Sequence, residues 1–487
     1  MTDLRLIPAA LTAWAVTAAG ISWGYAAAGA AVLGGVAATV ATGCWASRTR
    51  TRGGRGPVLI AAAAVALVGG GFAVAVCLRV DAVRHHPVTT YVGSVAEVVI
   101  TPDETPRVLD GGRTMFRATL ARLDGVPSSG AVLVFASGAD YAAIPAGRPA
   151  GFRARVSRPG RQDLTVAVLS ATGRPRLGEA APVYRLAHRI RAGFADAVRL
   201  VLPGDQAALV PALVLGDTSA VPATTAKDFR VAGLTHLMAV SGANITIVCA
   251  AMLLSAVLLG PRAAVVLAAV TLAGFVVVVQ PSASVLRAAV MGAITLLAVL
   301  THRRRQALPA LAAAVIVLMV ATPQLAVDVG FALSVSATAG LVLVAPVWSQ
   351  RLTGRGWPKP LADAVSVALA AQLITAPLVA GVSGSVSLVA VIANLLVAPV
   401  IPPITLIGTA AAALCPMWPA GAQLLIRFTG PEVWWLGSVA RWAAAVPVAA
   451  LPVPSGFAGV AVVAAASCLV AAVWHWALSG RRDTIVR

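Results

Sequence analysis

Residues 233–248 read GLTHLMAVSGANITIV, and this stretch begins the larger membrane region of a 487-residue chain. Its second half continues as an apolar helix, but Ser241, Gly242 and Asn244 interrupt the apolar run. Polar groups inside lipid are costly because hydrocarbon offers them no hydrogen-bond partner. The stretch therefore indicates either a broken helix that lines a cavity, with His236 beside the break, or tight helix packing through small residues.

The composition of the whole chain is that of a membrane protein. It is 59% hydrophobic and 11% charged, and its mean hydropathy is +0.87. The formal net charge of +19 comes almost entirely from arginine, because Lys227 and Lys359 are the two lysines. This excess fits arginine-rich cytoplasmic loops or an anionic polymer as substrate. All five cysteines lie in apolar stretches, which argues against a disulfide framework.

Twelve apolar segments are candidates for membrane spans. They lie near residues 6–22, 24–45, 57–79, 236–259, 262–280, 283–301, 306–322, 328–348, 361–381, 386–413, 421–448 and 457–479. The segments 386–413 and 421–448 contain prolines or charges, so either could be broken or interfacial. Within the second of these, Arg427 and Arg441 would lie about 40° apart on one continuous helix, a stripe suited to phosphates or anionic lipids. We expect a polytopic α-helical membrane protein of about ten to twelve spans.

Basic loops predict the orientation of these spans. The loop SRTRTRGGRG at 47–56 separates the second span from the third, and basic stretches also follow the spans that end near 301, 348 and 479. Because positively charged loops stay in the cytoplasm, we expect both termini there and residues 80–184 outside. This places the protein in the cytoplasmic (inner) membrane.

Residues 80–184 alternate apolar and polar side chains in five short segments. These are 94–100, 115–123, 131–137, 150–157 and 164–170, separated by turn signals such as LDGGR and SRPGRQD. Five strands in about a hundred residues predict a small all-β domain. We prefer an OB-type barrel, with a small β-sandwich as the alternative.

These patterns predict five regions along the chain. They are a three-helix membrane segment (1–79), an extracytoplasmic β-domain (80–184), an amphipathic interfacial helix (185–203), a transmembrane channel domain (204–480) and a cytoplasmic tail (481–487). The segment 185–203 carries one apolar and one basic face, which is typical of a helix at the membrane interface. A linker helix packed on the β-domain would show the same pattern.

The opening stretch resembles the signature of the ComEC family, the inner-membrane channel for DNA uptake in natural competence. That signature reads Gly-x-x-His-Leu-Leu-Ala-Val-Ser-Gly-Leu-His. The residues that match it are Gly233, His236, Leu237, Ala239, Val240, Ser241 and Gly242. Asn244 stands where the family has its second histidine.

Five further elements resemble family motifs in the same order along residues 205–402. They are LVLGDTSAV with Asp217, PSASVLRAAVMGAI with Arg287 and Met291, DVGFALSVSATAGL with Asp328, AAQLITAPLV with Gln372, and IANLLVAPVIP with Asn394. The resemblance implies that the polar members of these motifs shape a pore. Taken singly, Arg287 could snorkel, Asp328 could cap a helix, and the two amides could serve helix packing.

The sequence lacks the motifs of several enzyme classes. Neither lysine lies in a phosphate-binding loop of Walker type, and the six histidines do not cluster with carboxylates as metal ligands do. Ser241 and His236 are five residues apart and fall on different helical faces. We therefore expect no enzyme activity, no bound metal and no cofactor.

The resemblance implies a channel that carries single-stranded DNA inward during natural transformation. The β-domain would receive DNA through Arg113, Arg117, Arg153 and Arg155. Many family members carry a C-terminal metallo-β-lactamase-like domain, whereas this chain ends soon after its last expected span. We expect a DNA receptor outside, a separate nuclease and a cytoplasmic ATP-driven motor as partners, and allow for a homo-oligomer. The alternative is a secondary transporter for a small anionic solute, which would hold one compact midplane site.

Overall fold

The computed structural model describes residues 5–49, 56–109, 111–255, 260–301 and 306–479. Most of the basic loop at 47–56, the arginines of 302–305 and the tail at 480–487, on which the predicted orientation depends, lie outside the described residues. The chain divides into two compact units. The first comprises Met1–Arg189, Ala273–Thr295 and Arg304–Asp328, and the second comprises Ile190–Leu272, Leu296–Arg303 and Val329–Arg487.

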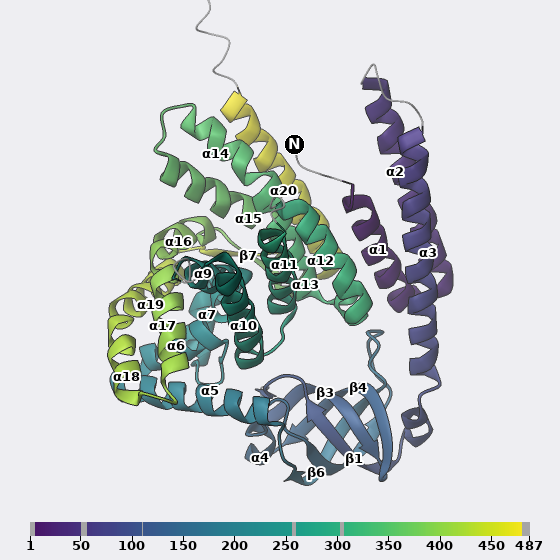
Figure 1. The fold of residues 1–487 in the computed structure, drawn as a ribbon, viewed down its shortest axis with the longest axis vertical. Helices are drawn as coiled ribbons and strands as arrows, with labels where there is room; N and C mark the ends of the chain where they lie inside the picture. The colour runs from purple at the N-terminus through teal and green to yellow at the C-terminus, as the bar shows by residue number, and fades with distance from the viewer. Residues whose placement is uncertain (1–4, 50–55, 110, 256–259, 302–305, 480–487) are drawn as a thin grey trace, which may run out of the picture. The chain divides into compact units, whose positions relative to one another are not determined.

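A closed β-barrel forms one part of the first unit (Figure 1). Its strands are β1 (Val95–Pro102), β2 (Arg107–Val108), β3 (Arg113–Leu123), β4 (Val126–Ser137), β5 (Ala150–Ser157) and β6 (Ala167–Leu177). The order is β1-β5-β6-β4-β3-β2, and β1 also pairs with β3, which closes five strands into a ring. Only the β4–β6 pairing is parallel among these described strands. This closed arrangement fits the expected OB-type barrel and differs from a two-sheet sandwich.

Alternation of side chains decides which face of each strand is buried. Along β5, Phe152, Ala154 and Val156 point into the barrel while Arg153 and Arg155 are exposed. Irregular pairing between Leu120 and Arg122 lets β3 bend around the barrel. A one-residue slip would bring arginines into the core, so the alternation strongly specifies the register.

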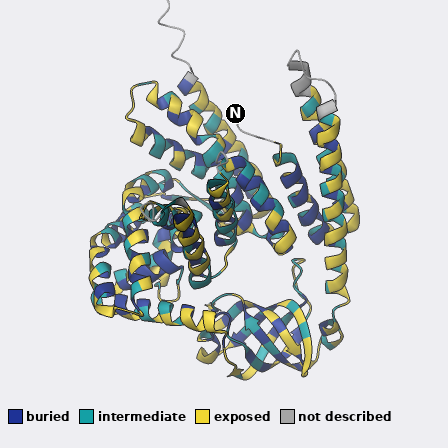
Figure 2. Cartoon of the chain, in the orientation of Figure 1, coloured by how far each residue is buried: buried dark blue, intermediate teal, exposed yellow. Residues whose placement is uncertain are grey.

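Helices make up the rest of the first unit. They are α1 (Ile7–Trp23), α2 (Tyr25–Thr49), α3 (Gly56–Arg84), α4 (Ala139–Ala142), α12 (Ala307–Ala321) and the 3-10 helices η1 (Pro87–Tyr91) and η3 (Pro323–Val327). Helix α1 packs against α2, α3 and α12. Most of α2 and α3 is exposed although both helices are apolar (Figure 2), which suits contact with lipid.

The second unit is helical apart from a two-stranded ribbon. It contains α6 (Gly204–Leu215), α7 (Ala223–Val231), α8 (Thr235–Met238), α9 (Gly242–Ser255), α13 (Val329–Leu343), α14 (Ala345–Thr353), α15 (Lys359–Ser383), β7 (Ser385–Ser387), α16 (Ala390–Val397), η4 (Ala398–Val400), α17 (Ile401–Leu414), α18 (Pro419–Phe428), α19 (Gly430–Ala445), β8 (Ala450–Pro452) and α20 (Gly456–Ser479). Residues of α5 (Pro182–Val201), α10 (Pro261–Val279) and α11 (Ala283–Leu300) belong to both units. Helix α6 packs against α17 and α19, and Ala207–Leu215 are all buried.

The expected polytopic membrane fold is confirmed. Within the described residues, eight helices are long and apolar enough to cross a membrane, and four shorter apolar helices accompany them. Four expected spans are not continuous helices. The segment 328–348 is divided into α13 and α14, and 386–413 into β7, α16, η4 and α17. The segment 236–259 is broken between α8 and α9, and 421–448 is divided into α18 and α19. Arg427 and Arg441 therefore lie on different helices, so the expected single stripe was wrong.

Candidate functional site

The break in the signature stretch has a local cause. Ala239 is extended, with φ −95° and ψ 134°, which ends α8. Ser241 then caps α9, because its Oγ accepts the backbone N–H of Asn244 at 3.4 Å and its hydroxyl donates to Asn244 Oδ1 at 3.0 Å. Serine is favoured at this position because its side chain satisfies an N–H that has no partner within the helix. Ser241 and Asn244 thus start α9 together.

Asn244 also fixes the signature to the end of α6. Its buried amide donates from Nδ2 to the carbonyl of Leu213 at 3.2 Å. The last carbonyls of a helix lack partners within that helix, so this bond satisfies one of them. Next to it, Gly216 ends α6 with φ +71°. A Cβ on Gly216 would lie 3.2 Å from Val240 Cγ2, so this glycine allows the close approach of the signature.

A largely buried ion pair completes this end of α6. Arg191 Nη2 lies 3.4 Å from Asp217 Oδ2, with the two side chains 10% and 23% exposed. Arg191 Nη1 donates to the carbonyl of Leu215 at 2.9 Å, and Asp217 Oδ1 accepts the Ser219 hydroxyl at 2.6 Å. Burial lowers the pKa of Arg191 and the neighbouring Asp217 carboxylate opposes that shift, and an arginine remains protonated in proteins. We call Arg191, Leu213, Asp217, Ser241 and Asn244 the α6 cluster.

Sequence reasoning missed Arg191. The signal was its place on the apolar stripe of α5, three and seven residues before Phe194 and Val198, which are fully buried. An arginine at such a position needs a buried acceptor, and Asp217 supplies it.

The first glycine of the signature lies against the segment just before the Asn394 motif. Gly233 has φ +72°, and a Cβ there would lie 2.5 Å from Ala390 Cβ at the start of α16. Gln372 Nε2 donates to the carbonyl of the adjacent Ser387 at 3.3 Å. Asn394 bonds within its own helix, to the carbonyl of Ala390 at 2.8 Å. Gly233, Gln372 and Asn394 thus all contact residues 387–390.

His236 lies on α8, between Gly233 and the Ser241–Asn244 cap in the sequence. Its side chain is exposed and hydrogen-bonds to the backbone of Gly233. Gly242 is the first residue of α9. His236 is thus solvent-accessible at a position that many other residues surround, and the role of both residues in a pore stays a prediction.

The first unit holds the other two charged motif residues. Arg287 is buried on α11 and donates from Nη1 to Met291 Sδ at 3.3 Å. Asp328 Oδ2 lies 3.8 Å from Nη1 of Arg117 on strand β3. A predicted pore residue is therefore paired with a predicted DNA-contact residue.

A second contact joins the barrel to the loop before α11. Gln280 accepts both the backbone N–H and the hydroxyl of Thr105, at 3.1 and 3.0 Å. Gln280 itself has φ +74°, a conformation that costs energy in a non-glycine residue. The barrel loop that carries Thr105 thus holds the start of the Arg287 helix.

The four predicted DNA-contact arginines do not form one cluster. Arg153 pairs across from Glu97 near the start of β1, whereas Arg117 lies beside the end of that strand, where Pro102 pairs with Ala118. Five residues of strand separate these positions by roughly 17 Å. All four side chains, including Arg113 and Arg155, are exposed. Arg153 and Arg155 form one pair, which we call the β5 arginines.

The described residues include no group of three or more His, Cys, Asp or Glu that could hold a metal ion. Each of the five cysteines is a free thiol. The polar groups described above are of two kinds: the buried, hydrogen-bonded side chains of the α6 cluster and the exposed arginines of the barrel.

Comparison with known proteins gives two matches and one negative result. The family described as "Competence protein" matches residues 213–478, more than half of the chain. A relative, "ComE operon protein 3" of Bacillus subtilis (strain 168), is 29% identical over 201 residues. That alignment covers 41% of this chain and 25% of the relative, so the chain matches about a quarter of the relative's length. No solved structure matches.

Proposed function

Because the chain belongs to the competence protein family, we propose that it conducts single-stranded DNA across the cytoplasmic membrane during natural transformation. The observation that carries the proposal is the α6 cluster. It brings the Leu-Gly-Asp segment and the Val-Ser-Gly signature, both inside the matched region, onto one helix end with an interrupted helix beside it. Irregular backbone is tolerated at membrane depth where it lines a wet path or is buried in protein.

The arrangement of polar groups supports a path for a polymer more than a site for a small solute. Arg287 bonds to Met291, Asp328 pairs with Arg117 of the barrel, and Asp217 and Asn244 bond within the α6 cluster, so each polar motif has its own local partners. A solute transporter would gather such groups into one compact site, whereas conduction of a polymer needs weak, repeated contacts.

In this proposal the barrel lies outside and receives the strand, and both termini lie in the cytoplasm. The chain would then run through the five regions expected from the sequence, which are the three N-terminal helices, the barrel, the linking helix, the channel domain and the cytoplasmic tail. The motor is a separate ATP-driven protein, since the sequence carries no Walker loop. A surface receptor and a nuclease are separate partners as well, and the channel acts alone or as a homo-oligomer.

Strand-resolved DNA import in a deletion strain tests the proposal. Duplex DNA is labelled on one strand or the other, and surface-bound label is separated from nuclease-protected label. We expect the deletion to abolish protected single strands while surface binding persists, and the reintroduced gene to restore import. Undiminished import without the gene would refute the channel.

A further inference from the structure

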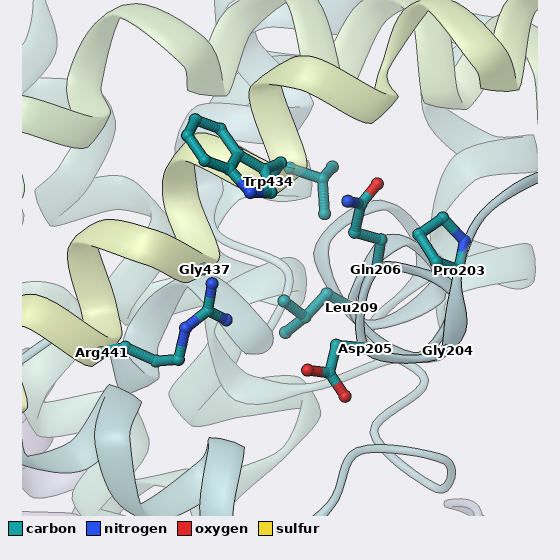
Figure 3. A pocket seen from close by; sticks show the side chains of 9 residues that line it. Pro203, Gly204, Asp205, Gln206, Leu209, Trp434, Gly437 and Arg441 are labelled. Carbon is teal, nitrogen blue, oxygen red and sulfur yellow. The ribbon is translucent and has the colours of Figure 1, made fainter.

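A pocket of about 340 Å³ lies between the first turn of α6 and the helix α19. Asp205 and Gln206 enter it from α6, and Trp434 and Arg441 enter it from α19 (Figure 3). Leu209 lies between the charged groups. The pocket is separate from the α6 cluster, which forms at the other end of the same helix.

The two charged side chains in the pocket have opposite signs. Arg441 donates from Nη2 to the Ser438 hydroxyl at 3.1 Å, and its guanidinium reaches toward the space that Asp205 faces (Figure 3). Among the ion pairs of the described residues, none joins Asp205 to Arg441. A ligand that carries one negative and one positive group would satisfy both.

Exposed aromatic and apolar side chains on α19 and on nearby helices of the chain indicate a lipid as the source of this ligand. Trp434, which lines the pocket, is 51% exposed, and Trp442, later on α19, is 58% exposed. Two apolar side chains on the preceding helices of the chain, Phe428 of α18 and Leu200 of α5, are 61% and 78% exposed. Exposed tryptophans are enriched at the level of lipid headgroups. Because Trp434 lines the pocket and is half exposed, the pocket is open to a phospholipid headgroup at that level.

We propose that this pocket binds the headgroup of an aminophospholipid of the phosphatidylethanolamine class. The phosphate accepts hydrogen bonds from Arg441, and the primary ammonium donates to the Asp205 carboxylate. The ammonium also lies against the face of Trp434, as cations do on aromatic rings. Gln206 offers an amide to the phosphate ester oxygens.

The acidic residue decides between this ligand and others that carry phosphate. Asp205 repels an anionic lipid that lacks an amine, and it equally repels a DNA strand, whose charges are all negative. A quaternary amine fits less well, because it cannot donate a hydrogen bond to Asp205.

Native mass spectrometry of the purified full-length protein tests the proposal. The delipidated protein is offered phosphatidylethanolamine, phosphatidylcholine or phosphatidylglycerol of identical chains. We expect phosphatidylethanolamine to bind with the highest occupancy. Arg441→Gln and Asp205→Asn should each weaken its binding by about tenfold, as loss of one hydrogen bond between charged groups does. The matched control is Arg427→Gln, an exposed arginine of α18 that does not line the pocket, and it should bind like wild type. Unchanged thermal unfolding of all three variants shows that they are folded.

Four results would overturn the proposal. Equal binding of all three lipids by wild type and variants would mean ordinary annular lipid. Tight phosphatidylglycerol binding that Asp205→Asn increases would mean an anion site. Competition by water-soluble glycerophosphoethanolamine at the affinity of the lipid would assign the same chemistry to a solute. Binding of a single-stranded oligonucleotide that Arg441→Gln abolishes would assign the pocket to DNA.

Discussion

The barrel and the α6 cluster place their polar side chains in opposite ways. On β5, arginines point outward and apolar residues point inward, so charge and core are separated. In the α6 cluster, Asn244 is 4% exposed and Arg191 is 10% exposed, and both donate to carbonyls at the end of a buried helix. The same residue type is therefore free to meet a ligand in one region and committed to structure in the other.

This difference gives the polar motif residues two distinct meanings. Removing one member of a buried ion pair is costly because the other charge stays buried. Substitutions in the α6 cluster should therefore first lower the free energy of unfolding. An exposed charge contributes little to stability, so changes on the barrel should first affect binding. Substitutions in the two regions test whether stability and binding respond separately in this way.

The largest effect is expected from Arg191→Met. Removing the guanidinium leaves the largely buried Asp217 carboxylate without its ion-pair partner and the Leu215 carbonyl without its donor, which should cost about 3–5 kcal/mol in the free energy of unfolding. The control is Arg199→Met on the same helix, because Arg199 pairs with Asp196 in an exposed ion pair worth less than about 1 kcal/mol. Denaturant unfolding of the purified proteins measures both. Equal losses in the free energy of unfolding would show that the Arg191–Asp217 pair stabilises the protein no more than the exposed pair does.

A smaller loss is expected from Gly233→Ala. The methyl group would lie 2.5 Å from Ala390 Cβ, closer than two carbons can pack, and it would add a side chain at a positive φ. Overpacking of this kind costs about 1–3 kcal/mol. Gly456→Ala is the matched control, because Gly456 has φ +73° with nothing near its Cβ position. The difference between the two variants isolates the contact with α16. No difference would mean that backbone strain alone explains the glycine.

On the barrel, Arg153→Gln together with Arg155→Gln should alter binding without altering stability. Each lost phosphate contact reduces the salt slope of single-stranded DNA binding by about 0.7, so the pair should reduce it by about 1.4. Stability should stay within about 0.5 kcal/mol of wild type. Arg355→Gln, outside the barrel, serves as control. Fluorescence anisotropy at several salt concentrations measures the slope, and an unchanged slope would remove the β5 arginines from the DNA contact.

The barrel could be predicted from sequence because its alternation is strong. Strand β6 still differs, since it runs Ala167–Leu177 rather than 164–170. Leu164 has φ +67°, which ends the extended backbone there, and the strand instead continues past Arg174. Alternation identified the strand but could not locate this left-handed residue.

The membrane region was harder to predict because almost every residue in it is apolar. Apolar length located most spans, but it gave no sign that α6 is buried, since its twelve residues contain Pro211 and fall short of a span. The motifs pointed to Asp217, Ser241 and Asn244, whose contacts depend on tertiary structure. Their convergence on one helix end, and the part of Arg191 in it, could not be obtained from spacing alone.

The central claim is that the signature stretch lies on the path of DNA, and nuclease-protected DNA import in a His236→Ala strain tests it most directly. The substitution removes an exposed imidazole without adding volume, so membrane abundance and surface DNA binding should stay normal while import falls sharply. His85→Ala is the control, because His85 is also exposed but pairs with Asp81 on α3. We predict lost import in the first strain and normal import in the second. Wild-type import by a normally abundant His236→Ala protein would contradict the claim and leave the signature as packing alone.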